Sequence, residues 1–147
     1  MPQRCIAAPD EGGDCWRACI ASVLDMPAAM VPNFAHLHPD WDTMIAAARE
    51  WLAPRGWSIF RSYISAGWDL DDVLSWFSGN NPHVPVILTG QSAADPKDNH
   101  AVVLLNGRIA HDPSNAGLAG PCVNEKGEPG WWWYDVICVA AIEAEEA

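Results

Sequence analysis

Three residues of this chain have types that together can perform acyl chemistry: Cys15, His100 and Asp112. Cys15 follows Asp14, which we expect to be the N-cap of a helix that begins at Cys15. The unpaired N–H groups and the dipole at a helix start favour a thiolate, and the same N–H groups can hold an oxyanion. Because a free cysteine is usually a buried core residue, Cys15 alone does not establish a site.

A base and a group that orients it follow later in the chain. His100 opens a predicted strand after the polar segment 91–99, where an imidazole can face a cleft and accept the thiol proton. Asp112 ends the partner strand just before Pro113 and could orient that imidazole. Taken one at a time, each is better explained as an ordinary polar group at a strand end. The two residues support a catalytic interpretation only if their side chains are in contact.

The Asn106-Gly107 turn between the two strands decides whether they meet. A two-residue type I′ loop pairs residue 105 with residue 108 and points Asp112 to the face opposite His100. A three-residue loop with Gly107 in the left-handed region pairs residue 104 with residue 108, and His100 then lies directly opposite Asp112. The catalytic interpretation requires the second register or an equivalent bulge.

The segments that carry these residues also resemble a known group. Residues 13–24 (GDCWRACIASVL), 31–34, 99–103 (NHAVV) and 111–114 (HDPS) resemble small phage and bacterial proteins that look like papain-like, C39-type cysteine peptidase domains. The resemblance runs from about Gln3 to Trp133. It implies a papain-like α+β fold, with an N-terminal Cys-bearing helix packed on a C-terminal antiparallel sheet. It also implies Cys15 as nucleophile, His100 as base and Asp112 as orienting group.

Thiolate attack on an acyl carbon gives a thioester. We therefore expect a cysteine-dependent hydrolase or acyltransferase that acts on a peptide, isopeptide or amide bond. The substrate could belong to a host protein. Papain-like members usually carry a Gln before the Cys, and here Pro9 stands at that position. Gln3 is the expected oxyanion donor, with Gln91 or Asn99 as alternatives. The residues expected to contact substrate are Trp16, Gln91, Asn99 and His111.

Two other interpretations of the same residues remain open. Cys15 and Cys19 are spaced i, i+4 on the predicted helix and could ligate zinc with Cys5, Cys122 or a histidine. The usual Cys-x2-Cys pair is absent, so we expect no metal and no other cofactor, with Cys19 in the core and Cys138 buried in a strand. The alternative to an enzyme is a non-catalytic module that sequesters a host protein or small ligand on the same scaffold.

The elements that must position the site divide between the two halves of the chain. Hydrophobic periodicity predicts helices over 15–26, 40–52 and 69–77, and strands over 57–64, 84–89, 100–105, 108–112 and 131–142, with a loop over 113–130. Helices first and antiparallel strands later indicate an α+β fold. We expect one domain over residues 1–142 and an acidic tail over 143–147.

Charge and composition exclude some partners. The 19 acidic and 8 basic residues give a formal charge of −11, which disfavours nucleic acid and anionic membranes. No apolar run of about 18 residues and no hydrophobic signal region is present, so we expect no membrane span and a cytoplasmic location. The five cysteines form an odd set and are expected to be free thiols. The sequence leaves the oligomeric state open.

Overall fold

An antiparallel sheet with helices on both faces forms the centre of this computed structural model, which describes residues 14–38, 40–65, 67–80, 82–124 and 126–140. The fold is α+β, with an N-terminal helix and a C-terminal antiparallel sheet. In chain order the elements are α1 (Asp14–Leu24), η1 (Ala28–Met30), α2 (Phe34–Leu37), α3 (Trp41–Leu52), η2 (Ala53–Arg55), β1 (Trp57–Ile64), α4 (Leu70–Asn80), β2 (Val86–Ser92), β3 (Asn99–Leu105), β4 (Arg108–His111), β5 (Leu118–Gly120) and β6 (Trp132–Val139).

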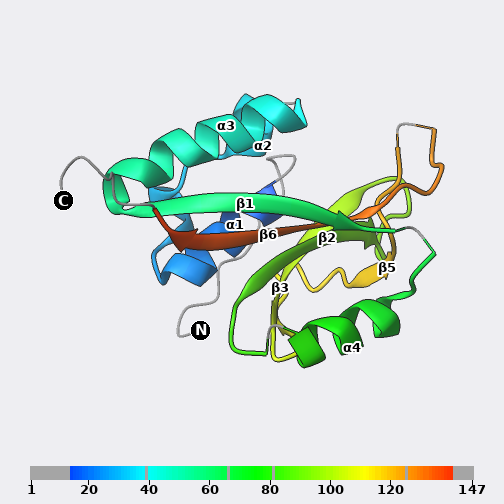
Figure 1. Cartoon of the computed structure of the whole chain (residues 1–147). Coiled ribbons are helices and arrows are strands. Elements are labelled where there is room, and N and C mark those ends of the chain that lie inside the picture. Colours follow the sequence, from blue (N-terminus) through cyan, green and yellow to red (C-terminus); the bar gives the residue numbers. More distant parts are fainter. Residues whose placement is uncertain (1–13, 39, 66, 81, 125, 141–147) are drawn as a thin grey trace.

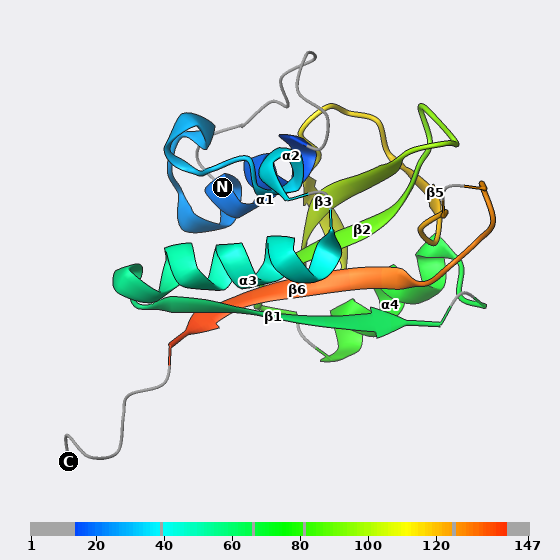
Figure 2. The same cartoon turned by 90° about the horizontal axis from the view of Figure 1, so that it is seen from above.

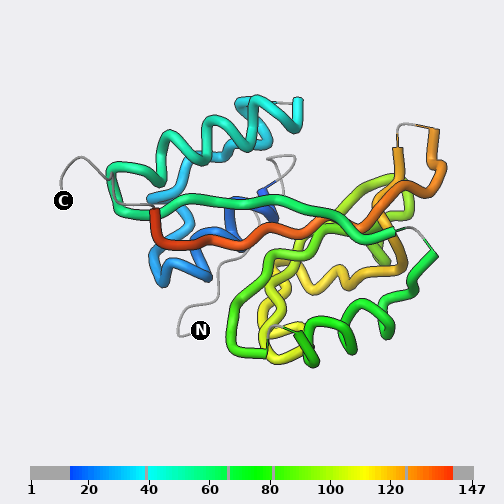
Figure 3. Tube along the Cα trace, in the orientation of Figure 1, coloured from blue at the N-terminus to red at the C-terminus, as the bar shows by residue number. Residues whose placement is uncertain are grey.

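The strand order is β1-β6-β2-β3-β4, and β5 pairs with the end of β2. The last strand is therefore inserted beside the first, and β1 and β6 run side by side along their length (Figure 3). Figure 1 shows α4 on the opposite side of the sheet from α3, and Figure 2 shows α1 and α2 beside α3. The sheet thus separates two hydrophobic layers.

Alternation along the strands assigns side chains to these layers. On one face Ile87 of β2 and Val103 of β3 belong to the same core cluster as the fully buried Ile20 of α1. On the other face Leu88 and Trp132 belong to the cluster under α4. The small residues of α1, Ala18, Cys19 and Ala21, are all 0 % exposed. Their size lets this helix lie against β3, the strand that begins with Asn99 and His100.

Most predicted elements are present, with shifts at their ends. The strand over 57–64 has the predicted bounds, and Asp40 caps α3 by accepting the Thr43 N–H at 3.2 Å. Helix α1 begins one residue earlier than expected and includes Asp14, so Asp14 does not have the predicted position before the helix. Two short elements were not predicted: β5 lies in the segment 113–130 that we predicted as a loop, and α2 lies between the first two predicted helices.

Some expectations fall on residues that the structure does not describe. Gln3, Cys5 and the acidic tail over 143–147 lie outside the described residues. Among the helices in the described ranges, none has both the length and the apolar character needed to cross a membrane.

Candidate functional site

Cys15 is the second residue of α1, and polar contacts fix the first turn of that helix. Arg17 donates from Nη1 to Asp14 Oδ1 at 3.0 Å. The Arg17 Nε–H is shared by two backbone oxygens, those of Ala28 at 2.9 Å and Val31 at 2.8 Å. Asp14 therefore stabilises α1 through an i, i+3 pair inside the helix, and the helix start is tied to the segment that follows it.

The Cys15 thiol is half-buried, and its environment differs from the expected one. Burial raises the pKa of this thiol above its ordinary value. The backbone N–H groups of Ala101, Trp16 and Cys15 itself act in the opposite direction, and the charge of Asp14 adds to the increase. Because desolvation exceeds the helix-start effect here, the resting group is a thiol at neutral pH. The thiolate that we expected from helix position alone is not favoured.

His100 and Asp112 form a direct pair. His100 Nε2 lies 2.6 Å from Asp112 Oδ1, and the Gly117 N–H donates to the other carboxylate oxygen at 2.8 Å. Burial raises the pKa of Asp112, but hydrogen bonds from His100 and Gly117 more than offset this, and the net pKa is lowered. Asp112 is therefore ionised at neutral pH and can only accept, so Nε2 carries the hydrogen. Nδ1 is left as the ring nitrogen able to take a proton.

A bulge in the hairpin brings the two side chains together. The turn has the two-residue form, with Asn106 at φ 55° and Gly107 at φ 70°, and residue 105 pairs with residue 108. One residue, Ala110, is then inserted, because Ile109 faces residue 104 while His111 faces residue 103. Because of this insertion, the residues after Ala110 point to the opposite face of the sheet from the one that strict alternation would give them. Asp112 therefore points to the same face as His100. The structure thus combines the first predicted register with the bulge that the pairing requires.

Cys15 and His100 line one pocket of about 170 Å³ on the face of the sheet covered by α1 and α3. Its lining residues are Cys15, Trp16, Ala35, His38, Trp41, Met44, Thr89, Asn99, His100 and Ala101. The backbone N–H of Ala101, the residue after His100, lowers the pKa of the Cys15 thiol, so the two groups are close together. Most of this wall is apolar, so an acyl group entering beside Cys15 would leave water.

Thr89 is a pocket residue that the sequence analysis did not select. It is 3 % exposed, and within the described ranges its Oγ1 has no hydrogen-bond partner. A buried hydroxyl without a partner costs about 1–3 kcal/mol, which a ligand in the pocket could recover. A signal was present in the sequence, because Thr89 is the one polar residue of the apolar run over 84–89.

The residues expected to contact substrate divide into two groups. Trp16 and Asn99 line the pocket, but the Asn99 amide is bonded in both directions to the Val123 backbone, at 2.9 and 2.8 Å. Gln91 is not in the lining, and its Nε2 donates to the Pro96 carbonyl at 3.0 Å. His111 is buried on β4 opposite Val103, also outside the lining.

The other described cysteines do not lie at this pocket. Cys19 is fully buried as expected. Cys122 donates to the Thr89 carbonyl at 3.3 Å, and burial raises its pKa to about 12. Cys138, expected to be buried, is exposed, because it lies near the end of β6 on the face opposite Ile137, which packs under α1 and α3. Over the ranges that the structure describes, no three His, Cys, Asp or Glu side chains gather as a metal-ligand group.

Comparison of this chain with models of protein families, with curated proteins and with solved structures gives no match.

Proposed function

We propose that the protein is a cysteine-dependent hydrolase of peptide, isopeptide or amide bonds, with a papain-like arrangement of Cys15, His100 and Asp112. One observation carries this proposal. His100, whose imidazole is held by an ionised Asp112 at 2.6 Å, is a lining residue of the same pocket as Cys15. A nucleophile, a base and a group that orients the base are the minimum set for this chemistry.

In the proposed reaction, His100 Nδ1 takes the Cys15 proton as the sulfur attacks the acyl carbon. The C–N bond then breaks, the amine leaves with that proton, and the acyl group remains on sulfur as a thioester. Water, deprotonated by His100, attacks the thioester, the C–S bond breaks, and the carboxylic acid and the free thiol are released. Asp112 holds the ring throughout and stabilises its protonated form.

The raised pKa of Cys15 is compatible with this scheme, since deprotonation would accompany attack instead of preceding it. Backbone N–H groups of Cys15 and Trp16 lie against the sulfur at the start of α1. The same N–H groups are suitable donors to the oxyanion that develops beside the sulfur. Gln3, which we expected to supply a further donor, remains a proposal because it lies outside the described residues.

Acyl transfer to Cys15 provides the test. The protein would be mixed with p-nitrophenyl acetate, and intact mass spectrometry would follow the acetyl adduct while absorbance follows p-nitrophenol. We expect one adduct, on Cys15, followed by turnover; Cys15→Ala should remove both. His100→Gln should slow adduct formation by roughly 10²–10⁴-fold, the usual contribution of a general base. Cys138→Ala is the matched control, because this thiol is exposed and is not among the residues that line the pocket.

The burial of Cys15 also favours a second candidate, the non-catalytic binding module. A thiol that is kept protonated by desolvation suits a packed ligand site as well as a catalytic one. Iodoacetamide labelling in a Cys138→Ala background separates the two. Preferential labelling of Cys15 that is lost in His100→Ala supports the hydrolase. Slow labelling of the remaining thiols at equal rates, without p-nitrophenol turnover, favours the binding module.

A further inference from the structure

A second hollow lies beside the Cys15 pocket on the same face of the sheet. It has a volume of about 420 Å³ and is lined by Trp41, Asp42, Ile45, Arg49, Arg61 and Trp133. Trp41 lines both hollows. The sheet register connects them as well, because Thr89 pairs with Ala101 on one side and with Trp133 on the other. A bound molecule could therefore extend from the thiol into the second hollow.

Arg61 is held rigidly at the base of this second hollow. Its Nε and Nη2 donate to the two oxygens of the fully buried Asp135, at 2.7 and 2.8 Å. Its guanidinium lies 4.3 Å from the ring centre of Trp41 and 5.6 Å from that of Trp133. The Asp135 pair uses one edge of the guanidinium, which leaves Nη1 on the other edge. Because the ion pair and the indole rings fix the plane, this donor is preorganised.

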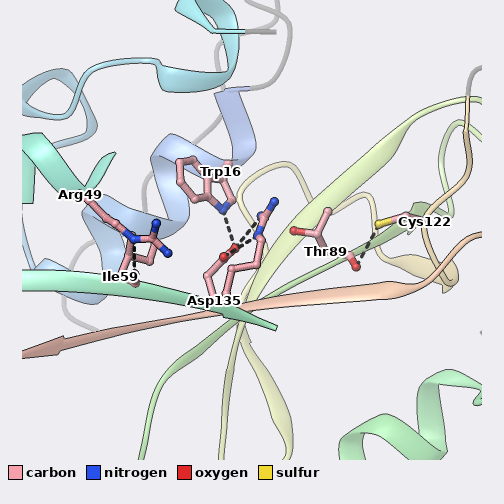
Figure 4. Close-up of polar contacts among 7 residues, drawn as sticks. Trp16, Arg49, Ile59, Thr89, Cys122 and Asp135 are labelled. Atoms are coloured by element: carbon pink, nitrogen blue, oxygen red, sulfur yellow. Dashed lines mark hydrogen bonds and ion pairs between the residues drawn. The ribbon is translucent and has the colours of Figure 1, made fainter. Parts of the chain in front are cut away.

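Arg49 supplies a second cation from α3. Its Nε donates to the Ile59 carbonyl at 3.1 Å, and Figure 4 shows its other two nitrogens pointing away from Ile59, towards the side of Asp135. Across the described ranges, no carboxylate lies within ion-pair distance of Arg49. Asp135 neutralises Arg61, so Arg49 is the cation of this hollow that has no ion-pair partner within the described residues, in a chain whose formal charge is −11.

These charges favour an anionic occupant. Two of the eight basic residues line this hollow; Asp135 neutralises Arg61, and the acidic residue of the lining is the exposed Asp42 at the start of α3. A cation would be repelled by Arg49, and Trp41, the ring nearest to Arg61, is already stacked on that guanidinium. Elsewhere the acidic surplus repels anions, so a carboxylate would be directed to this place. Arginine is also the side chain best suited to bind a carboxylate.

We propose that this second hollow binds a carboxylate of the substrate, so that the substrates are acidic peptides or amides. The inference names the substrate class of the proposed hydrolase and rests on that proposed function. Strands are about 4.8 Å apart, so the row from Ala101 through Thr89 to Trp133 spans about 10 Å. An extended chain covers that distance in about three residues. The acidic group therefore lies two to three residues from the bond that is cleaved.

Binding to the Cys15→Ala variant tests the inference without any chemistry. Four peptides would be compared by calorimetry: acetyl-Glu-Ala-Leu-Gly-amide and acetyl-Gly-Leu-Ala-Glu-amide, each with a partner in which Gln replaces Glu. The two Glu peptides have opposite sequence order, so only one of them should place its carboxylate in the second hollow. We expect that peptide to bind about tenfold more tightly than its Gln partner, a difference of ~1.4 kcal/mol. The advantage should shrink as salt is added.

Variants locate the effect. Arg49→Gln should abolish the preference for Glu, and Arg49→Lys should retain part of it. Arg55→Gln is the matched control: it removes an equal charge nearby, from a guanidinium 4.0 Å above the Trp51 ring and outside the hollow. Asp42→Asn should strengthen binding of the Glu peptide. The proposal is overturned if Glu and Gln peptides bind equally in both directions, or if Arg49→Gln and Arg55→Gln have the same effect.

Failure of the two proposals is distinguishable. A Glu preference in the Cys15→Ala variant, without acetyl transfer in the wild type, keeps the carboxylate site and removes the hydrolase. Acetyl transfer without a Glu preference does the reverse.

Discussion

Two carboxylates in this molecule each bind a basic side chain. Comparing the two pairs shows which one is suited to transfer a proton and which one holds the structure in place. Asp112 pairs with His100 at the Cys15 pocket, and its side chain is 15 % exposed. Asp135 pairs with Arg61 inside the sheet and is 0 % exposed. An imidazole is the usual general acid–base group of proteins, whereas a guanidinium acts as a fixed positive charge. Only the first pair is therefore suited to acid–base chemistry.

The second pair nevertheless acts on the same region of the fold. Asp135 also accepts from Trp16 Nε1 at 3.0 Å, a contact between α1 and β6 that spans 119 residues of sequence. Trp16 follows Cys15 directly and lines the same pocket. The buried Asp135–Arg61 pair thus anchors the start of α1 to the sheet. This anchoring helps to place Cys15 at the pocket where the His100–Asp112 pair lies. The predictions below test this division.

The largest expected effect is on activity when the pocket pair is broken. Asp112→Asn should reduce acyl transfer by roughly 10²–10⁴-fold, because the neutral amide does not stabilise the protonated ring and can also present its NH2 group to Nε2, which favours the wrong tautomer. The melting temperature should change little at neutral pH. The acetyl-adduct assay and thermal unfolding, run on the same preparation, check both statements. A variant that keeps wild-type rates would remove Asp112 from the proposed mechanism.

The next effect is on stability when the buried pair is broken. Asp135→Asn should lower the free energy of unfolding by about 3 kcal/mol, because Arg61 is left without a counter-ion. Urea denaturation measures it. The double variant Asp135→Asn with Arg61→Met should cost less, since no buried charge then remains and the amide oxygen can still accept from Trp16. If Asp135→Asn abolished acyl transfer while the free energy of unfolding stayed unchanged, the division between the two pairs would be wrong.

A smaller effect is expected at Thr89, which lies between the two pairs. Thr89→Val keeps the shape of the side chain and removes the hydroxyl that has no partner within the described residues. Stability should stay equal or rise, while KM rises about fivefold if the hydroxyl binds substrate, the effect of one hydrogen bond of ~1 kcal/mol. Steady-state kinetics with an amide substrate give the split between KM and kcat. An unchanged KM would assign Thr89 to packing alone.

The smallest effect is a pH dependence of stability. Because the pKa of Asp112 is lowered in the folded protein, its ionised form stabilises the fold above the unfolded pKa of about 3.9. That contribution is lost as the pH falls through the folded pKa. The stability difference between wild type and Asp112→Asn should be constant above about pH 5 and should shrink below about pH 4. Urea titrations at a series of pH values measure it, and a difference that grows in acid would contradict the assignment.

Local patterns predicted much of this architecture. The alternating aromatic and β-branched residues of 57–64 predicted β1 with its observed bounds, and Gly56 just before it has the left-handed conformation, at φ 83°, that glycine adopts readily. The Asn106-Gly107 turn also has one of the two predicted forms. In each case the determining interactions lie within a few residues of sequence, where propensity and turn chemistry act.

Features that depend on distant contacts could not be predicted in the same way. The Arg61–Asp135 pair follows from the register of β1 on β6, which joins residues 74 apart. The state of the Cys15 thiol depends on burial against β3, and that desolvation outweighs the helix-start effect visible in the sequence. The meeting of His100 with Asp112 depends on an inserted residue that no turn rule places at Ala110.

That inserted residue has a consequence for how this hairpin could change in evolution or in the laboratory. Side chains on a strand alternate, so the face of Asp112 depends on whether the count of residues after the turn is odd or even. Deleting Ala110 would leave Cys15, His100 and Asp112 all present and yet separate the last two. An insertion or deletion of one residue in β4 would therefore separate Asp112 from His100, and a second one would bring them together again. A sequence alignment that matches the three residues but misplaces a gap in β4 would not reveal this change.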